Sequence, residues 1–174
     1  MTISEPVQVW IMLSEGEKVP KGLQAVLVDS ADPENPETGK KIKLDTLWKE
    51  KVVILYFYPK DNTPGCTTEA RDFQEALVKI EKSGGRVIGC SRDNIKSHCK
   101  FIGKLDLNFP LLSDEEGEVT EAFGVWAEKK MYGKTFMGII RSTFIIENGK
   151  IIKSYPKVKV KEHVGEILEF LKLR

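Results

Sequence analysis

The longest apolar run of the chain is the feature that most constrains its fold. It extends from Val52 to Tyr58 and consists of seven consecutive aliphatic and aromatic residues. An unbroken run of this length is typical of a strand that is buried on both faces of a sheet. Pro59 ends the run, because proline has no N–H with which to continue a ladder. We therefore expect this segment to lie in the middle of a central sheet.

Apolar periodicity divides the rest of the chain into alternating strands and helices. Further strands are predicted at residues 23–28, 86–90, 109–112, 142–146 and 150–155. Helices are predicted at residues 64–83, after Asp93 or Asn94, at 119–123 and around 164–171. Asn148-Gly149 separates the last two strands and indicates a tight hairpin. We predict an α/β fold with a mixed central sheet flanked by helices, parallel inside and antiparallel at one side.

The helix predicted between Pro64 and Ser83 has one apolar face. The apolar residues at helical spacing are Ala70, Phe73, Leu77 and Ile80. The charged residues that this pattern leaves outside are Glu69, Asp72, Glu75 and Lys79. We expect the apolar face to pack on the sheet and the four charged side chains to face solvent.

Length and composition favour one ordinary globular domain. The chain has 174 residues, 41% of them hydrophobic, and a net charge of +1. This balance gives no global attraction to nucleic acid or to a membrane surface. The first twenty residues lack a signal-peptide pattern, and no apolar stretch approaches the roughly 20 residues that cross a bilayer. We expect a cytoplasmic protein with an N-terminal extension at residues 1–12 and one domain at 13–174, with a strand or a loose arm at residues 5–13.

The three cysteines, Cys66, Cys90 and Cys99, are odd in number and unevenly spaced. They do not form the framework of a disulfide-stabilised secreted domain. A metal site would need clustered cysteine and histidine, yet His98-Cys99 is the only adjacent pair. We expect no metal and no cofactor, which leaves each cysteine as a core residue or a reagent.

Cys66 occupies the most informative position of the three. Thr63-Pro64 begins the predicted helix and places Cys66 in its first turn. A helix N-terminus offers free N–H groups and a partial positive charge, which favour a thiolate by roughly 0.3 to 2 kcal/mol. Lowering a cysteine pKa from about 8.5 to about 6 needs about 3.4 kcal/mol. A cation must supply the rest, and Arg141, at the start of an apolar strand, is the candidate.

The segment FYPKDNTPGCTTEA resembles the active site of the peroxiredoxins, and within them the bacterioferritin comigratory protein or peroxiredoxin Q group. Pro59, Thr63 and Cys66 match the family motif. Further matching segments follow in order: VIGCSRD, SDEEGEVTEAFGVW and GIIRSTFII. The resemblance extends from about residue 13 to the C-terminus and implies a thioredoxin-like fold.

The resemblance implies a role for each motif residue. Cys66 would be the peroxidatic cysteine, which becomes a sulfenic acid when it takes one oxygen from a hydroperoxide. Thr63 would hydrogen-bond to the peroxide, and Pro64 would shield the sulfur from water. Arg141 would stabilise the thiolate and the charge that develops on the leaving oxygen. The implied partners are a hydroperoxide substrate and thioredoxin or a similar dithiol reductant, with a monomer favoured over a dimer.

The chain departs from many members of this group at Arg71, where they carry a resolving cysteine. Cys99 lies in the region where other members keep theirs, so it is the candidate resolving residue. It also falls on an apolar stripe with Ile95 and Ile102, and a small core residue is the alternative. Cys90 interrupts a buried strand and is expected to be inert. If neither cysteine resolves, an external thiol must meet the sulfenic acid directly.

Two other functions remain open at this point. A thiol-disulfide oxidoreductase on the same fold would need a Cys-x-x-Cys pair, which Cys66 lacks. A non-catalytic thioredoxin-like binding domain would explain the fold but not the combination of Pro59, Thr63, Cys66 and Arg141.

Overall fold

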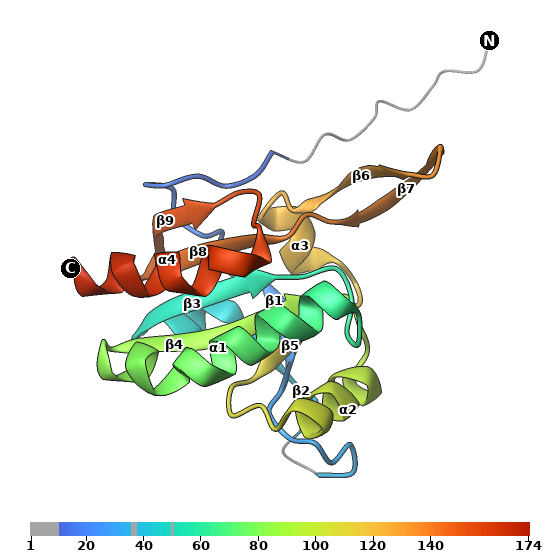
Figure 1. Cartoon of the computed structure of the whole chain (residues 1–174), viewed down its shortest axis with the longest axis horizontal. Coiled ribbons are helices and arrows are strands. Elements are labelled where there is room, and N and C mark those ends of the chain that lie inside the picture. Colours follow the sequence, from blue (N-terminus) through green and yellow to red (C-terminus); the bar gives the residue numbers. More distant parts are fainter. Residues whose placement is uncertain (1–10, 36–37, 50) are drawn as a thin grey trace.

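The computed structural model describes residues 11–35, 38–49 and 51–174. Its main strands are β1 (Gln24–Val28), β2 (Lys40–Lys43), β3 (Val52–Phe57), β4 (Gly85–Ser91), β5 (Leu111–Ser113), β8 (Ser142–Glu147) and β9 (Lys150–Tyr155). They form one sheet in the order β2-β1-β5-β4-β3-β8-β9. The helices are η1 (Leu44–Trp48), α1 (Pro64–Lys82), α2 (Ile95–Leu105), α3 (Glu118–Ala122) and α4 (Val160–Lys172). This confirms the α/β fold with a mixed sheet flanked by helices (Figure 1).

The sheet is parallel in the middle and antiparallel at both sides. β3, β4 and β5 are parallel neighbours, because α1 and α2 return the chain across the sheet between them. β8 and β9 continue the sheet antiparallel beside β3, and β1 and β2 do so beside β5. The prediction of a single antiparallel side was therefore wrong. The polar segment after β1 allows an antiparallel return to β2, which pattern alone did not reveal.

β3 separates two hydrophobic cores. Ile54 and Tyr56 face the core beneath α1, α2 and α4, whereas Val53, Leu55 and Phe57 face the core that η1 and α3 cover. Every residue of β3 is buried. The predicted central strand is thus confirmed, and core residues pack against both of its faces.

The Asn148-Gly149 hairpin is also confirmed, because both residues have positive φ, 51° and 77°, as the tight turn requires. A second hairpin was not predicted. It consists of β6 (Trp126–Met131) and β7 (Lys134–Ile139), which form a two-stranded sheet of their own. Most of its side chains are exposed, so no apolar alternation marks it in the sequence.

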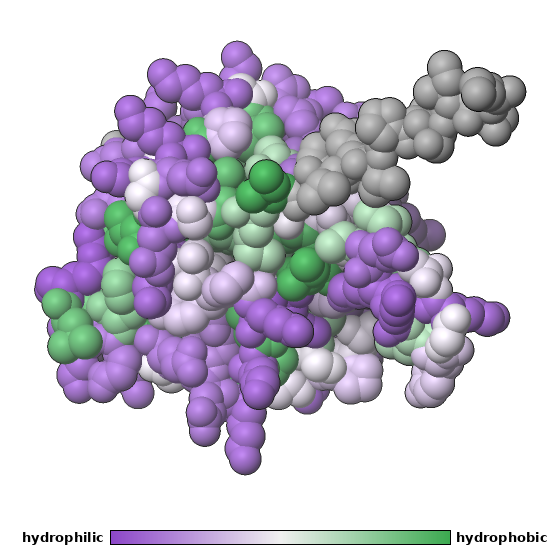
Figure 2. Space-filling model, turned by 90° about the horizontal axis from the view of Figure 1, so that it is seen from above, coloured by the Kyte–Doolittle hydropathy of each residue, from purple (hydrophilic) through white to green (hydrophobic). Residues whose placement is uncertain are grey.

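The expected arm at residues 5–13 falls mostly outside the described residues, and residues 11–13 form no strand. Figure 2 shows hydrophilic residues over much of one face, with hydrophobic residues between them. Within the described residues, no helix combines the length and apolar character that a bilayer span requires.

Candidate active site

Cys66 lies where the buried strand β3 gives way to helix α1. The connecting loop turns sharply at Asn62, which has φ 60°. Pro64 occupies the first helical position, where its missing N–H costs no hydrogen bond. Cys66 follows in the first turn with 1% of its surface exposed. The sulfur is therefore shielded from bulk water and lies close to the free N–H groups of the helix start.

Arg141 reaches Cys66 because of the sheet register. Phe57, the last residue of β3, pairs with Ser142, the first residue of β8. Arg141 directly precedes Ser142 and so lies beside the end of β3. Its Nη2 atom is 3.3 Å from the Sγ atom of Cys66. Gly65 leaves room for the guanidinium group, because a Cβ atom there would lie only 3.2 Å from Nη2.

Glu69 is the main correction to the sequence prediction, which placed it on the outer face of the helix. It is 1% exposed, and its Oε1 atom accepts a hydrogen bond of 2.7 Å from Nη1 of Arg141. Its Oε2 atom has no hydrogen-bond partner among the described residues. Burial raises the pKa of Glu69 to about 7, although Arg141 opposes the shift. Glu69 follows Cys66 by three residues, so the two side chains are neighbours on the surface of α1.

The guanidinium group of Arg141 thus contacts a thiol and a carboxyl group with two different nitrogens. Burial lowers its pKa, but Glu69 and Cys66 together raise it by more. Lys129 of β6 lies within the same field: burial and then Arg141 lower its pKa, and Cys66 raises it. The β6–β7 hairpin therefore brings a second cation near the site.

Thr63 and Pro64 lie at the start of α1, as the motif predicts. The Thr63 hydroxyl donates a hydrogen bond of 2.8 Å to the carbonyl oxygen of Lys60. Since that bond uses the hydroxyl proton, the oxygen remains able to accept one. Pro59 begins the loop directly after the buried Tyr58.

The three cysteines are all free and buried, but they do not share one core. Cys66 and Cys99 belong to the core beneath α1, α2 and α4. Cys90 belongs to the core on the opposite side of the sheet. Burial raises the pKa of both Cys90 and Cys99, a shift that favours their unreactive thiol form. Arg71 is exposed on α1.

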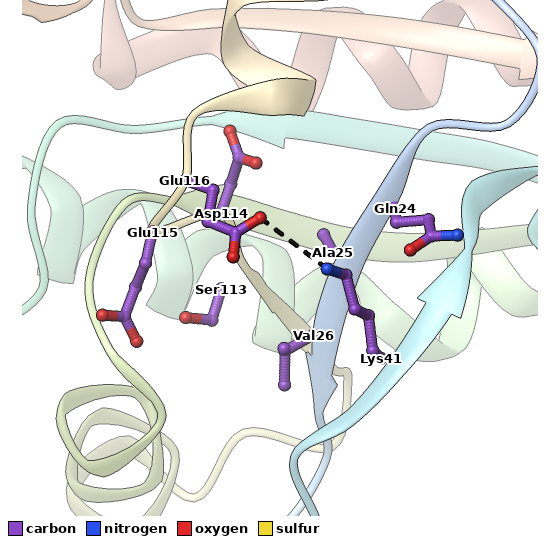
Figure 3. Close-up of a pocket in the computed structure, with 8 residues that line it drawn as sticks. All are labelled: Gln24, Ala25, Val26, Lys41, Ser113, Asp114, Glu115 and Glu116. Atoms are coloured by element: carbon purple, nitrogen blue, oxygen red, sulfur yellow. Dashed lines mark ion pairs between the residues drawn. The ribbon is translucent and has the colours of Figure 1, made fainter.

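A cavity of about 280 Å³ lies elsewhere, between β1, β2 and the segment after β5 (Figure 3). Several of its polar side chains already have partners. Asp114 accepts hydrogen bonds from the backbone N–H groups of Val119 and Thr120, and Glu116 forms an ion pair with Lys41. No thiol lines this cavity, so it is not the reactive site.

Comparisons with known proteins agree with this geometry. Residues 25–155 match the model of the AhpC/TSA family. The peroxiredoxin Bcp of Bacillus subtilis (strain 168) is 50% identical over 135 residues, which cover 77% of this chain and 85% of that protein. The putative peroxiredoxin Rv2521 of Mycobacterium tuberculosis is 40% identical over 156 residues, or 89% of this chain and 92% of that protein.

Solved structures give the same result. One is the bacterioferritin comigratory protein of Xanthomonas campestris, studied for its alkyl peroxide reduction activity. It has a TM-score of 0.79 and 36% identity, and the match covers 94% of this chain and 98% of that one. A mutant PrxQ of Xylella fastidiosa has a TM-score of 0.81 and 35% identity over 94% and 97%. The family resemblance and the thioredoxin-like fold are confirmed, and the chain belongs to the AhpC/TSA family as a thiol peroxidase of the peroxiredoxin group.

Proposed function

We propose that Cys66 is the residue that takes an oxygen atom from the peroxide. We also propose that Arg141 stabilises the negative charge on the Cys66 sulfur. The observation that carries the proposal is the 3.3 Å contact between Nη2 of Arg141 and Sγ of Cys66 at a helix start. A charge-assisted hydrogen bond of this kind favours a thiolate over a thiol. Arg141 and the N-terminus of α1 thus meet at the same sulfur atom.

In the first step the Cys66 thiolate attacks the nearer oxygen of a hydroperoxide. An S–O bond forms and the O–O bond breaks, which leaves a sulfenic acid and an alkoxide or hydroxide that takes up a proton. Arg141 stabilises the negative charge as it moves from sulfur to the leaving oxygen. The free acceptor capacity of the Thr63 hydroxyl suits it to receive a hydrogen bond from the peroxide, and Pro64 limits the access of water.

In the second step a thiol attacks the sulfenic sulfur and releases water. We assign this thiol to Cys99, which shares a core with Cys66, with an external thiol as the alternative. A dithiol such as thioredoxin then reduces the disulfide. We also propose a monomer that works in the cytoplasm, where free thiols persist.

The test is peroxide consumption by the wild type, Cys66→Ser and Cys90→Ser with dithiothreitol as reductant. We expect no turnover from Cys66→Ser and wild-type turnover from Cys90→Ser, because Cys90 lies across the sheet. Equal rates for the wild type and Cys66→Ser would exclude Cys66 as the reacting sulfur. Peptide mapping after one equivalent of peroxide identifies the resolving thiol: a linked Cys66–Cys99 peptide supports Cys99, and a Cys66 sulfenic adduct with free Cys99 contradicts it.

A further inference from the structure

A cluster of buried polar side chains joins the loop before Cys66 to the start of α2. Asp61 of the loop is 4% exposed, and His98 of α2 is fully buried. Their Oδ2 and Nδ1 atoms are 2.7 Å apart. Ser97 donates a hydroxyl hydrogen bond of 2.8 Å to Oδ2 of Asp61, and Tyr58 donates one of 2.6 Å to Oδ1. Two consecutive residues of α2 are thus bound to one carboxyl group of the active-site loop.

Both ring nitrogens of His98 are engaged in hydrogen bonds. Its Nε2 atom lies 3.0 Å from the carbonyl oxygen of Leu112, which can only accept, so Nε2 carries a proton. Its Nδ1 atom makes the 2.7 Å contact with Oδ2 of Asp61, a carboxyl group that also accepts from Ser97 and Tyr58. Hydrogen bonds in which the donor or the acceptor is ionised are stronger than hydrogen bonds between neutral groups.

The same cluster contains the three side chains whose ligand atoms lie within 4.8 Å of one another, Asp61, Asp93 and His98. These atoms already serve the protein itself. Asp93 accepts hydrogen bonds from the backbone N–H of Asp61 and the hydroxyl of Ser91 through one oxygen. The carboxyl group of Asp61 and both nitrogens of His98 are occupied as described above. The cluster therefore has the character of a structural joint and not of a metal centre.

This joint connects the two chain segments that carry the cysteines of the proposed reaction. Asp61 precedes Cys66 by five residues, and His98 directly precedes Cys99. Cys66 points toward Arg141, beside β8. Cys99 lies in the field of Asp32, which follows β1, and its helix packs against Ala31. Strands β5, β4 and β3 lie between β1 and β8 in the sheet, so the two cysteines lie over different parts of it.

A disulfide needs Cα atoms within about 7 Å of each other. Cys99 is 1% exposed and held in the core, so α2 must leave its place before its sulfur can meet Cys66. The contacts of Asp61 with Ser97 and His98 oppose that movement, because both must break when the first turn of α2 departs.

We propose that the Asp61–His98 contact is a clasp that keeps Cys99 in the core and couples its release to the active-site loop. The inference rests on the proposed function, in which Cys99 resolves the Cys66 sulfenic acid. Oxidation adds an oxygen atom to a sulfur that is 1% exposed, beside Arg141. The first turn of α1 and its preceding loop must shift to make room. That shift withdraws Asp61 from His98 and frees α2, after which Cys99 attacks Cys66 and water leaves. His98 is thus a positioning residue for the second step.

Two substitutions separate the clasp from simple packing. His98→Asn places an amide N–H where Nδ1 lies and keeps the contact with Asp61. His98→Gln places its amide near the position of Nε2, keeps the contact with Leu112 and loses the clasp. Both remove the imidazole ring, so His98→Asn is the matched control for His98→Gln.

The first measurement is the rate at which N-ethylmaleimide labels Cys99 in the reduced protein, resolved by peptide mapping. Losing a charge-assisted buried hydrogen bond is expected to raise this rate by about ten- to a hundredfold in His98→Gln relative to His98→Asn. Melting temperatures of the two variants serve as the check on global stability. Equal labelling rates in the two variants overturn the clasp.

The second measurement is rapid mixing with one equivalent of hydrogen peroxide. We expect Cys66 oxidation to change less than about twofold, whereas Cys66–Cys99 disulfide formation becomes at least about tenfold faster in His98→Gln than in His98→Asn. Faster labelling without faster disulfide formation overturns the coupling to resolution. Failure of Cys66 to oxidise in the wild type would instead refute the proposed function, so the two results are distinguishable.

Discussion

At the scale of single residues, the site depends on how the guanidinium group of Arg141 is shared between two partners. One guanidinium nitrogen contacts the Cys66 sulfur and another contacts the buried carboxyl group of Glu69. Arginine can make both contacts because its donors are arranged in a rigid planar fork. Glu69 therefore orients the cation and at the same time competes for it.

Replacing Arg141 with lysine is expected to lower the rate constant for Cys66 oxidation about 10- to 1,000-fold, because one ammonium group cannot satisfy both partners. Stopped-flow measurement of peroxide reduction checks this. Arg71→Lys is the matched control, since Arg71 is exposed on the same helix as Cys66. A loss of similar size in both variants would mean that the Arg141 contacts with Cys66 and Glu69 do not control the rate.

The motif residues were identifiable from the sequence, whereas their supporting residues were not. Cys66 stands in the first turn of a predicted helix, and Arg141 stands at the start of an apolar strand. Glu69 looked like an ordinary outward-facing charge, because helical periodicity assigns faces but does not reveal that another strand delivers a buried cation. Asp61 and His98 meet across 37 residues, a distance that no local pattern encodes.

At the scale of elements, strands β3 and β4 approach each other closely at Tyr56 and Gly89, under the helix that carries Cys66. A Cβ atom on Gly89 would lie 2.8 Å from Cδ2 of Leu111 and 2.8 Å from Cζ of Tyr56. Tyr56 is fully buried and stacks on Phe73 of α1, with ring centroids 4.5 Å apart. Gly89 therefore gives Tyr56 the space that seats α1 on the sheet.

Gly89→Ala is expected to lower the free energy of unfolding by about 1–3 kcal/mol through overpacking. The same change at Gly165 of α4 should raise it by about 0.5–1 kcal/mol, because that residue is helical and an added Cβ would meet no atom within 4 Å. Urea denaturation of both variants tests the pair. Destabilisation of similar size at Gly165 would show that the loss at Gly89 does not arise from contact with Tyr56 and Leu111.

Element prediction succeeded where burial imposes a pattern. The strand from Val52 and the helix from Pro64 are confirmed, since each buries a long apolar face. The β6–β7 hairpin was missed because its turn, Tyr132-Gly133, lies between exposed strands. The N-terminal extension and the start of the domain at residue 13 stay predictions.

At the scale of the whole molecule, two buried titratable groups shape how stability depends on pH. Burial raises the pKa of Glu69 to about 7, and burial together with Arg141 lowers the pKa of His163 to about 4. His163 lies on α4 and hydrogen-bonds with Thr143 of β8 over 2.7 Å. Both groups are buried in the folded state and titrate near their ordinary values when the chain unfolds.

The two shifts act in opposite directions. Glu69 binds its proton more tightly when folded, so its contribution is present below about pH 4.5 and is lost as pH rises through 7. His163 binds its proton more weakly when folded, so its contribution is present above about pH 6.5 and is lost as pH falls through 4. Each shift corresponds to about 3 kcal/mol. They therefore nearly cancel between about pH 4.5 and 6.5.

Removing either group should expose the contribution of the other to the pH dependence of the free energy of unfolding. In Glu69→Gln the His163 contribution is unopposed, so the free energy of unfolding should fall by about 3 kcal/mol more than in the wild type as pH falls from 7 to 4. In His163→Gln, which can keep a hydrogen bond to Thr143, the free energy of unfolding should instead rise by a similar amount relative to the wild type over the same interval. Urea denaturation at half-unit pH steps measures all three proteins. Parallel pH curves would contradict the assignment of buried, oppositely shifted groups to these two positions, because their titrations cannot cancel once either one is removed.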